Sequence, residues 1–212
     1  MKTDDLITML AKGPAPTAQP GTKRFALALG WGMFGATLLM ALLLGVRADL
    51  AGALAMPMFW AKLSFPAVAA LAALQLARRL ARPGLRPGTA PLVLAALLLS
   101  SWAGAATTLL AAAPDARAAL IFGDTWRTCP FNIALLSLPV FIAMFWAIKG
   151  LAPTRPALAG GSAGLTAGAA GAAVYALHCP EMAAPFLGIW YVLGIALPAL
   201  AGALLGPMAL RW

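Results

Sequence analysis

The run Phe25–Val46, FALALGWGMFGATLLMALLLGV, is 22 residues long and contains no charged side chain. A helix needs about 20 apolar residues to cross the hydrocarbon core of a bilayer. A cleaved signal peptide is the alternative, since Ala51, Ala53 and Ala55 resemble a cleavage site. Signal peptides have apolar regions of only about 7–15 residues, however, and here a long leader, Met1–Arg24, precedes the run. We therefore expect a retained membrane span.

The composition of the whole chain supports this expectation. Of 212 residues, 62% are hydrophobic and 10% are charged, against roughly a quarter charged in an ordinary soluble domain. The chain has too few polar groups to cover a soluble surface, so its natural surroundings are a lipid bilayer. The net charge of +9 is compatible with nucleic-acid binding, but the basic residues lie between apolar runs and form no stripe. We expect no direct contact with nucleic acid.

Six apolar segments are long enough to span a membrane, and several have a proline near their start, where its missing N–H costs nothing. They are Phe25–Val46, Phe59–Ala77, Pro91–Ala112, Phe131–Ile148, Pro156–Ala176 and Pro185–Ala209. The fold class expected is therefore an all-α, polytopic six-transmembrane-helix bundle over residues 24–212. Residues 1–23 are expected to form a cytoplasmic N-terminal segment.

The distribution of lysine and arginine predicts the orientation of the spans. Basic residues near membrane spans lie mostly on the cytoplasmic side. With the N-terminus inside, only Arg47, Lys62, Arg117 and Arg127 fall outside. The other eleven of the fifteen basic residues then face the cytoplasm: Lys2, Lys12, Lys23, Arg24, Arg78, Arg79, Arg82, Arg86, Lys149, Arg155 and Arg211. An even number of spans follows, with both termini in the cytoplasm.

The middle of every proposed span lacks Asp, Glu and Arg. Lys62 lies near the outer end of the second span, where we expect its stem to reach the interface. Ion-coupled transporters usually carry ionisable residues at mid-membrane depth, so this pattern disfavours a carrier. A small-molecule or ion carrier or channel nevertheless stays an alternative, because Asn132, Thr107 and Thr108 could line a path.

The fifth span is rich in glycine. Gly160, Gly164 and Gly168 recur every four residues, and Gly202 and Gly206 in the sixth span repeat the spacing. Small residues four apart share one helix face and let neighbouring backbones approach closely. Tight packing inside the bundle is the favoured interpretation. The alternative is a smooth face along which the helix slides or rotates.

The only two cysteines, Cys129 and Cys179, are both expected on the outer side. Each precedes a proline, which places it at a helix end or in a turn. The fourth and fifth spans are joined by a short inner loop, so their outer ends can meet. A structural disulfide is the first interpretation, provided that the two Cα atoms lie within about 7 Å.

Two further interpretations of the cysteines stay open. One is a reversible thiol switch that responds to oxidants through the thiolate; Arg127 could favour the thiolate of Cys129 by its charge. The other is a transient soft-metal site, in which Cys129, Cys179 and the only histidine, His178, supply two sulfur ligands and one nitrogen ligand. A lone histidine is more often a simple hydrogen-bonding group.

The sequence offers no support for catalysis. Membrane enzymes that make disulfides relay electrons through Cys-x-x-Cys pairs, and this chain has none. It also lacks a Ser-His-Asp set, a zinc-protease helix and a phosphate-binding loop. We expect a protein that is not an enzyme and holds no resident cofactor.

The N-terminal segment has the features of a short amphipathic helix. Thr3 can cap it, and Asp4 and Asp5 complement the helix dipole in its first turn. Its apolar face would comprise Leu6, Ile7, Met9 and Leu10. A helix this short is marginal alone in water, so it is expected to lie on the membrane or in a partner's groove.

Several motifs, spread from the first residues to the last, resemble those of one known family. They are Thr3-Asp4-Asp5-Leu6-Ile7, Trp126-Arg127-Thr128-Cys129, Pro153-Thr154-Arg155-Pro156-Ala157-Leu158-Ala159-Gly160, Tyr175-Ala176-Leu177-His178-Cys179-Pro180-Glu181, Trp190-Tyr191, Leu205-Gly206-Pro207 and Arg211-Trp212. The chain is similar to the NrsF-type family, the negative regulators of sigma-F, which are six-span bacterial inner-membrane anti-sigma factors. The second half of the chain carries the more specific motifs.

The resemblance implies a function. Such proteins hold an extracytoplasmic-function sigma factor inactive at the membrane, and outer-side cysteines in some members take part in sensing heavy metals or oxidants. The matching positions are Cys129 and Cys179, with His178, Arg127 and Glu181 as auxiliary residues at the same site. The positions implied for sigma-factor binding are Thr3, Asp4, Asp5, Leu6, Ile7 and Leu10, with inner-loop contacts from Arg78, Arg79 and Arg82.

Overall fold

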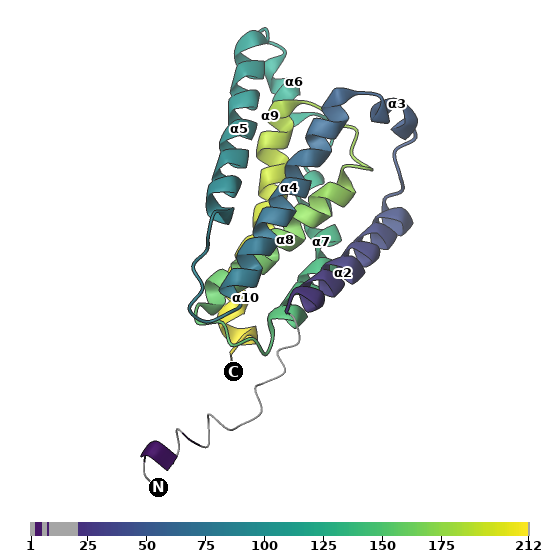
Figure 1. Ribbon diagram of the computed structural model, residues 1–212. Coiled ribbons are helices and arrows are strands. Elements are labelled where there is room, and N and C mark those ends of the chain that lie inside the picture. The colour runs from purple at the N-terminus through teal and green to yellow at the C-terminus, as the bar shows by residue number, and fades with distance from the viewer. Residues whose placement is uncertain (1–2, 6–7, 9–20, 212) are drawn as a thin grey trace.

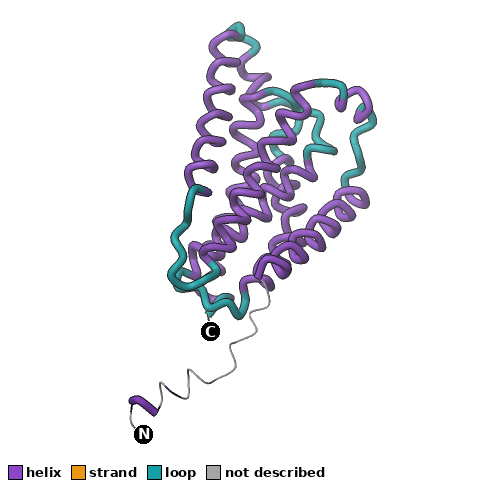
Figure 2. The backbone as a smooth tube through the Cα atoms, viewed as in Figure 1, coloured by secondary structure: helices purple, strands orange, loops and turns teal. Residues whose placement is uncertain are grey.

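The computed structural model describes residues 3–5, 8 and 21–211, and within these ranges every regular element is a helix (Figure 2). Six helices are long and apolar enough to cross a membrane, which confirms the predicted all-α six-helix architecture. The elements are α2 (Gly21–Leu43), α3 (Leu50–Leu54), α4 (Pro57–Leu80), α5 (Ala90–Ala111), α6 (Arg117–Phe122), α7 (Cys129–Ile148), α8 (Pro156–Tyr175), α9 (Ala184–Phe186), the π-helical turn η1 (Leu187–Tyr191) and α10 (Val192–Ala209).

The helix bounds differ from the sequence-based ones in ways that have local causes. A proline occupies the first turn of α4, α5, α7, α8 and α9, as its fixed φ favours. The second span is longer than the predicted 59–77: its helix starts at Pro57 and continues to Leu80. The sixth span, Ala184–Ala209, is helical throughout. Five of its residues form the π-helical turn η1, and the sequence did not indicate this turn.

Helix α8 lies at the centre of the bundle, and α5 lies at its edge (Figure 1). Of the span window in α8, 72% is buried inside the protein, compared with 6% in α5. Helices α4, α7 and α10 pack directly on α8, while α2 packs chiefly on α7. The glycine- and alanine-rich sequence of α8 explains its position, since small side chains let several helices approach one axis.

The contact between α8 and α10 is made backbone to backbone. A Cβ atom on Gly160 would overlap the carbonyl of Gly202, and one on Gly164 would overlap the carbonyl of Pro198. Gly206 packs in the same way on the carbonyl of Pro156. These contacts support tight packing as the role of the glycine pattern. They make α8 and α10 a closely packed pair.

The two ends of the bundle differ in composition. The start of α2 and the end of α10 lie at the same end (Figure 1), as an even number of spans requires. We call it the basic end, and its cationic residues within 21–211 are Lys23, Arg24, Arg78, Arg79, Arg82, Arg86, Lys149, Arg155 and Arg211. The opposite end carries α3, α6, Cys129 and Cys179, and we call it the thiol end.

Candidate functional site at the thiol end

The two cysteines are buried at the thiol end as free thiols. Cys129 is the first residue of α7, and Cys179 lies in residues 176–183, which we call the thiol loop, between α8 and α9. The disulfide predicted from their matching depth is not formed, and nothing in the structure joins one sulfur to the other.

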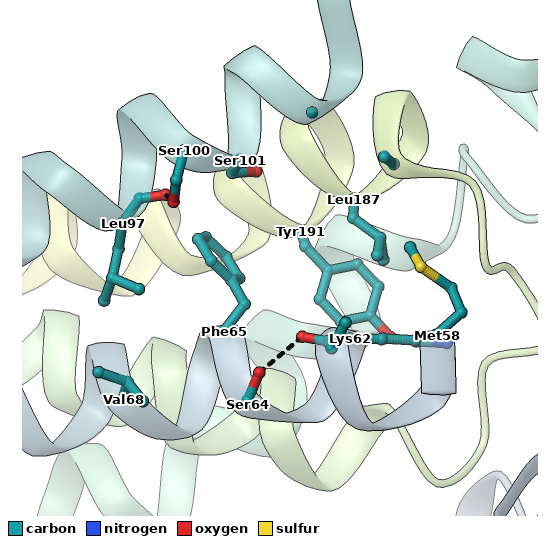
Figure 3. Close-up of a pocket in the computed structure, with 13 residues that line it drawn as sticks. Met58, Lys62, Ser64, Phe65, Val68, Leu97, Ser100, Ser101, Leu187 and Tyr191 are labelled. Carbon is teal, nitrogen blue, oxygen red and sulfur yellow. Dashed lines mark hydrogen bonds between the residues drawn. The ribbon is translucent and has the colours of Figure 1, made fainter. Parts of the chain in front are cut away.

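Lys62 corrects a second expectation. Its side chain does not extend to an aqueous interface; it is 1% exposed. The Nζ atom donates hydrogen bonds to the carbonyl oxygens of Cys179, at 2.6 Å, and Glu181, at 2.8 Å. It also lies 5.4 Å from the ring centroid of Tyr191, which is directed toward it (Figure 3). Burying a charge costs free energy unless the charge is hydrogen-bonded, and here the two carbonyl oxygens provide those bonds. The same bonds tie α4 to the thiol loop.

Arg47 makes a second attachment to the same loop. Its backbone N–H donates to the carbonyl of Leu177 at 3.2 Å, and its guanidinium donates to the carbonyl of Cys179 at 3.3 Å. Two further bonds of 2.7 Å reach the carboxylate of Asp49. This hydrogen-bonded pair raises the pKa of Arg47 and lowers the pKa of Asp49 from their ordinary values. The segment after α2 is thereby joined to the thiol loop.

His178 serves as a hydrogen-bonding group in this structure. Its Nδ1 lies 2.9 Å from the carbonyl oxygen of Gly45, and because a carbonyl only accepts, Nδ1 must carry the proton. The described residues contain no group of three or more His, Cys, Asp or Glu side chains that could hold a metal ion. The predicted ligand set of Cys129, Cys179 and His178 is therefore not assembled.

Glu181 joins the thiol loop to the segment between α6 and α7. Its Oε1 accepts hydrogen bonds from the backbone N–H of Asp124, at 2.8 Å, and from the N–H and hydroxyl of Thr125, both at 3.3 Å. Gly123 makes room for the carboxylate, since a Cβ atom there would overlap it. Arg127, predicted beside Cys129, is exposed and stacks on Trp126 with 5.1 Å between its Cζ and the ring centroid.

Aromatic residues of the last span complete the site. Tyr191 is fully buried, and its ring lies 5.9 Å from that of Tyr175. Trp190 donates from Nε1 to the carbonyl of Ile121 at 2.8 Å and packs against Trp126. Both Trp190 and Tyr191 belong to the π turn, and such turns are frequent at functional sites.

The thiol loop is therefore attached to three other parts of the chain. Lys62 holds it to α4, Arg47 and Gly45 hold it to the segment after α2, and Glu181 holds it to the segment before α7. We call these contacts the loop clamp. A buried hydrogen-bonding group left without a partner costs about 1–3 kcal/mol, so moving the loop means breaking several costly contacts together. The sulfur of Cys179 is buried within this clamped loop.

Sequence reasoning missed Lys62, Arg47 and Tyr191 as members of this site. One signal was present for Lys62: it is the only charged residue in the six spans away from the basic end, and an ionisable residue inside a span marks a functional site by default. Arg47 gave no such signal, because arginine is ordinary near a membrane surface. Tyr191 entered only as part of the family motif Trp190-Tyr191, with no role in the site attached to it.

The residues predicted to contact a partner lie at the basic end or before it. Arg24 donates to the carbonyls of Trp146 and Lys149 at 2.6 and 3.0 Å. Arg78 donates to the hydroxyl of Thr22 at 2.9 Å. Arg79 and Arg82 are exposed, as are the described residues of the N-terminal segment, which include Thr3, Asp4 and Asp5. Leu6, Ile7 and Leu10 lie outside the described residues.

Comparisons with known proteins identify the family. The sequence pattern of the family described as "Negative regulator of sigma F" matches residues 10–212. The chain is 54% identical over the full length of both proteins to the "Probable anti-sigma-F factor NrsF" of Azospira oryzae. It is 39% identical, again over both full lengths, to the "Anti-sigma-F factor NrsF" of Caulobacter vibrioides. No solved structure matches the chain. The chain therefore belongs to the family of negative regulators of sigma F, which are anti-sigma factors.

Proposed function

We propose that this chain is an integral-membrane anti-sigma factor that holds an extracytoplasmic-function sigma factor at the cytoplasmic face of a bacterial inner membrane. Family membership supports the sigma-factor partner. Six apolar helices of spanning length support membrane insertion. The observation that carries the orientation is the gathering of cations at the end where α2 starts and α10 ends, because cytoplasmic loops are enriched in Lys and Arg.

The sigma factor would bind on the cytoplasmic side, to the N-terminal segment and the nearby inner loop. The segment combines acidic residues, Asp4 and Asp5, with apolar ones, Leu6, Ile7 and Leu10, and begins at Thr3. Such a pattern suits an amphipathic helix that is ordered in a partner's groove. Arg78, Arg79 and Arg82 would add contacts beside it.

The signal would act on the thiols from the periplasmic side. A soft metal ion would displace the thiol proton into water and form a metal–sulfur bond. A peroxide would transfer one oxygen atom to a thiol and leave as water, giving a sulfenic acid. In either product the sulfur carries an additional atom, although its site in or beside the thiol loop is buried and has room for a thiol. The loop clamp would then open, and α4, α7 and α8 would repack toward the basic end.

The energies involved are of the right size for such a switch. Moving a population from about 1:99 to 99:1 needs roughly 5.5 kcal/mol of differential interaction. The clamp contains bonds from Lys62, Arg47, His178 and Glu181 to the loop or its neighbours. The bond from Lys62 to Cys179 is the buried one of these four, and a buried group left unpaired costs about 1–3 kcal/mol. Opening the clamp would therefore cost a few kcal/mol, which the metal–sulfur bond or the oxidation would have to supply.

The partner assignment is tested by capture of sigma factors from detergent-solubilised membranes. Deleting residues 1–20 should abolish capture while the protein still floats with lipid vesicles. Capture that is unchanged by the deletion would place the binding surface elsewhere. The competing assignment, a carrier or channel, requires solute flux in proteoliposomes, which we do not expect.

The sensing assignment is tested by replacing each cysteine separately. Cys129→Ser and Cys179→Ser should both retain the sigma factor at rest, because serine fills nearly the same space. Each should also blunt its release when cells are exposed to soft metals or peroxide. A normal release response in the double variant would make both cysteines purely structural.

A further inference from the structure

A groove runs along the seam between α4 and α5. Helix α5 has only Ala90 and Ala105 buried, so most of it stands clear of the bundle. Two hollows follow the seam, one of about 540 Å³ nearer the basic end and one of about 280 Å³ nearer the thiol end, and both are lined by Val68. Figure 3 shows the second hollow, with Phe65 and Leu97 on facing helices. We call the two together the α4–α5 groove.

The hollow nearer the basic end has an apolar body and a cationic mouth. Leu71 and Val93 line its body, while Gln75 and Arg79 lie toward the basic end. A further hollow of about 310 Å³ shares Gln75 and Arg79 with it and adds other arginines, Arg78 and Arg82. Arg79 therefore stands at the mouth of the apolar groove, and Arg78 and Arg82 line the neighbouring hollow, which Thr22 and Phe25 of α2 also border.

Arg79 is placed at this mouth by the loop that follows α4. Gly88, with a φ of +72°, lies against its guanidinium, and a Cβ atom there would be 2.8 Å from Nη1. Within the described residues, the side chain of Arg79 makes one hydrogen bond, from Nη1 to the carbonyl of Arg86 at 3.4 Å. A guanidinium has five N–H donors, so most of the donors of Arg79 remain available to a ligand.

Within residues 21–211, the basic end offers these arginines no side-chain carboxylate. The acidic residues in the range 21–211 are Asp49, Asp115, Asp124 and Glu181, and all four lie in segments of the thiol end. The charge at the mouth of the groove must therefore be balanced from outside residues 21–211. Guanidinium groups bind phosphate oxygens well, because their fork of donors matches that geometry.

The length of the groove indicates what accompanies the phosphate. From Arg79 to Val68 the helix rises by about 16 Å at 1.5 Å per residue, which is close to half of the roughly 30 Å hydrocarbon core. This is the depth of one leaflet. The apolar body of the groove thus has the length of one acyl chain that starts at the phosphate level.

We propose that the α4–α5 groove binds a phospholipid with a net negative headgroup, its phosphate on Arg79 with Arg78 and Arg82 beside it, and one acyl chain along Val68, Leu71 and Val93. This inference rests on the membrane insertion and orientation proposed above. An acidic segment of the sigma factor is the other conceivable occupant. The lipid is favoured because most of the groove lies at membrane depth, where a peptide's unpaired backbone groups would be costly.

The experiment uses the full-length protein purified in detergent, with lipid binding followed by native mass spectrometry. Phosphatidylglycerol should bind at least about tenfold more tightly than phosphatidylcholine, since each arginine contributes roughly fivefold. Arg79→Gln should lose about fivefold for phosphatidylglycerol alone. The matched control Arg117→Gln, at the thiol end, should change neither affinity. Val68→Trp, which fills the body of the groove, should weaken both lipids.

Several results would overturn the inference. Equal affinity for the two lipids, or an equal loss in the Arg117→Gln control, would remove the headgroup site. Inorganic phosphate that binds as tightly as the lipid and depends on Arg79 would remove the acyl chain. Lipid binding that is unchanged in Arg79→Gln would remove Arg79 from the headgroup site, and loss of sigma-factor capture in that variant would then leave Arg79 to the sigma factor alone. A protein that fails to float with vesicles would refute the proposed membrane insertion itself, which is a separate failure.

Discussion

The thiol end and the basic end treat their cations in opposite ways. At the thiol end, the charged groups of Lys62 and Arg47 are almost covered, and their donors are taken up by backbone carbonyls and by Asp49. At the basic end, Arg79 and Arg82 are exposed, and residues 21–211 provide no carboxylate near them. At the thiol end the cations are already paired within the protein, so a change there requires breaking internal hydrogen bonds. At the basic end the cations are open to an outside anion or partner.

The largest effect is expected from breaking the connection between the two ends. Gly164→Leu would drive a side chain into the carbonyl of Pro198, and α8 and α10 would have to separate. We expect a loss of more than about 3 kcal/mol of unfolding free energy, measured as reduced folded yield and thermal stability in detergent. Gly30→Leu is the matched control, because a Cβ atom on Gly30 meets nothing within 4 Å. Equal losses in the two variants would contradict the importance of the close α8–α10 packing.

The next effect opens the closed end alone. Lys62→Met leaves the carbonyls of Cys179 and Glu181 without their donor, and we expect a net loss of about 2 kcal/mol in the closure of the thiol loop. That loss corresponds to roughly 30-fold faster maleimide labelling of Cys179, read in a Cys129→Ser background. Lys23→Met, an exposed lysine at the basic end, should leave the rate unchanged. An unaltered rate in Lys62→Met would show that Lys62 does not hold the loop.

A smaller effect is expected where the thiol loop meets the segment before α7. Glu181→Gln keeps the shape of the side chain but replaces charge-assisted hydrogen bonds to Asp124 and Thr125 with neutral ones, which are about half as strong. The expected loss is about 1 kcal/mol in thermal unfolding. Asp115→Asn, another acid of the thiol end, serves as control. A Glu181→Gln variant as stable as the control would remove Glu181 from the loop clamp.

The smallest effect is a pH dependence. Arg47 lowers the pKa of Asp49, so the carboxylate adds stability that is fully present above its unfolded pKa of about 3.9. That stability is lost as the pH falls through the lower, folded value. Asp49→Asn should therefore lose stability at pH 7, and this loss relative to the unsubstituted protein should shrink as the pH falls through the lowered pKa of Asp49. A loss that is the same at pH 7 and well below a pH of about 3.9 would show that the ion pair with Arg47 does not contribute.

The fold could be predicted from the sequence because membrane spans announce themselves locally. Phe25–Val46 is long and apolar, and the loops on one side of the spans contain more Lys and Arg than the loops on the other side. The contact of α8 with α10 was also predictable in kind, since Gly160 and Gly164 recur at helical spacing. These properties belong to single segments, so a single sequence is enough to read them.

The candidate site could be predicted only in part, because it is built from long-range contacts. The sequence identified Cys129, Cys179, His178 and Glu181, but it could not show that Lys62 bonds to carbonyls 117 and 119 residues away. From hydropathy alone, a lysine near the end of a span, such as Lys62, is expected to extend its ammonium group to water. Cys129 and Cys179 are free thiols in the structure, and the disulfide between them stays a prediction, because the sequence gives the depth of each sulfur but not the rotation of each helix about its axis.

The most direct test of the account is whether opening the thiol end empties the basic end. Membranes that contain the Lys62→Met variant are compared with unsubstituted membranes for capture of the sigma factor, after flotation has confirmed equal insertion. The account predicts that Lys62→Met releases the sigma factor without any metal or oxidant. Full capture by a variant whose Cys179 has become rapidly labelled would contradict it, because the loop would then be open and the partner still held.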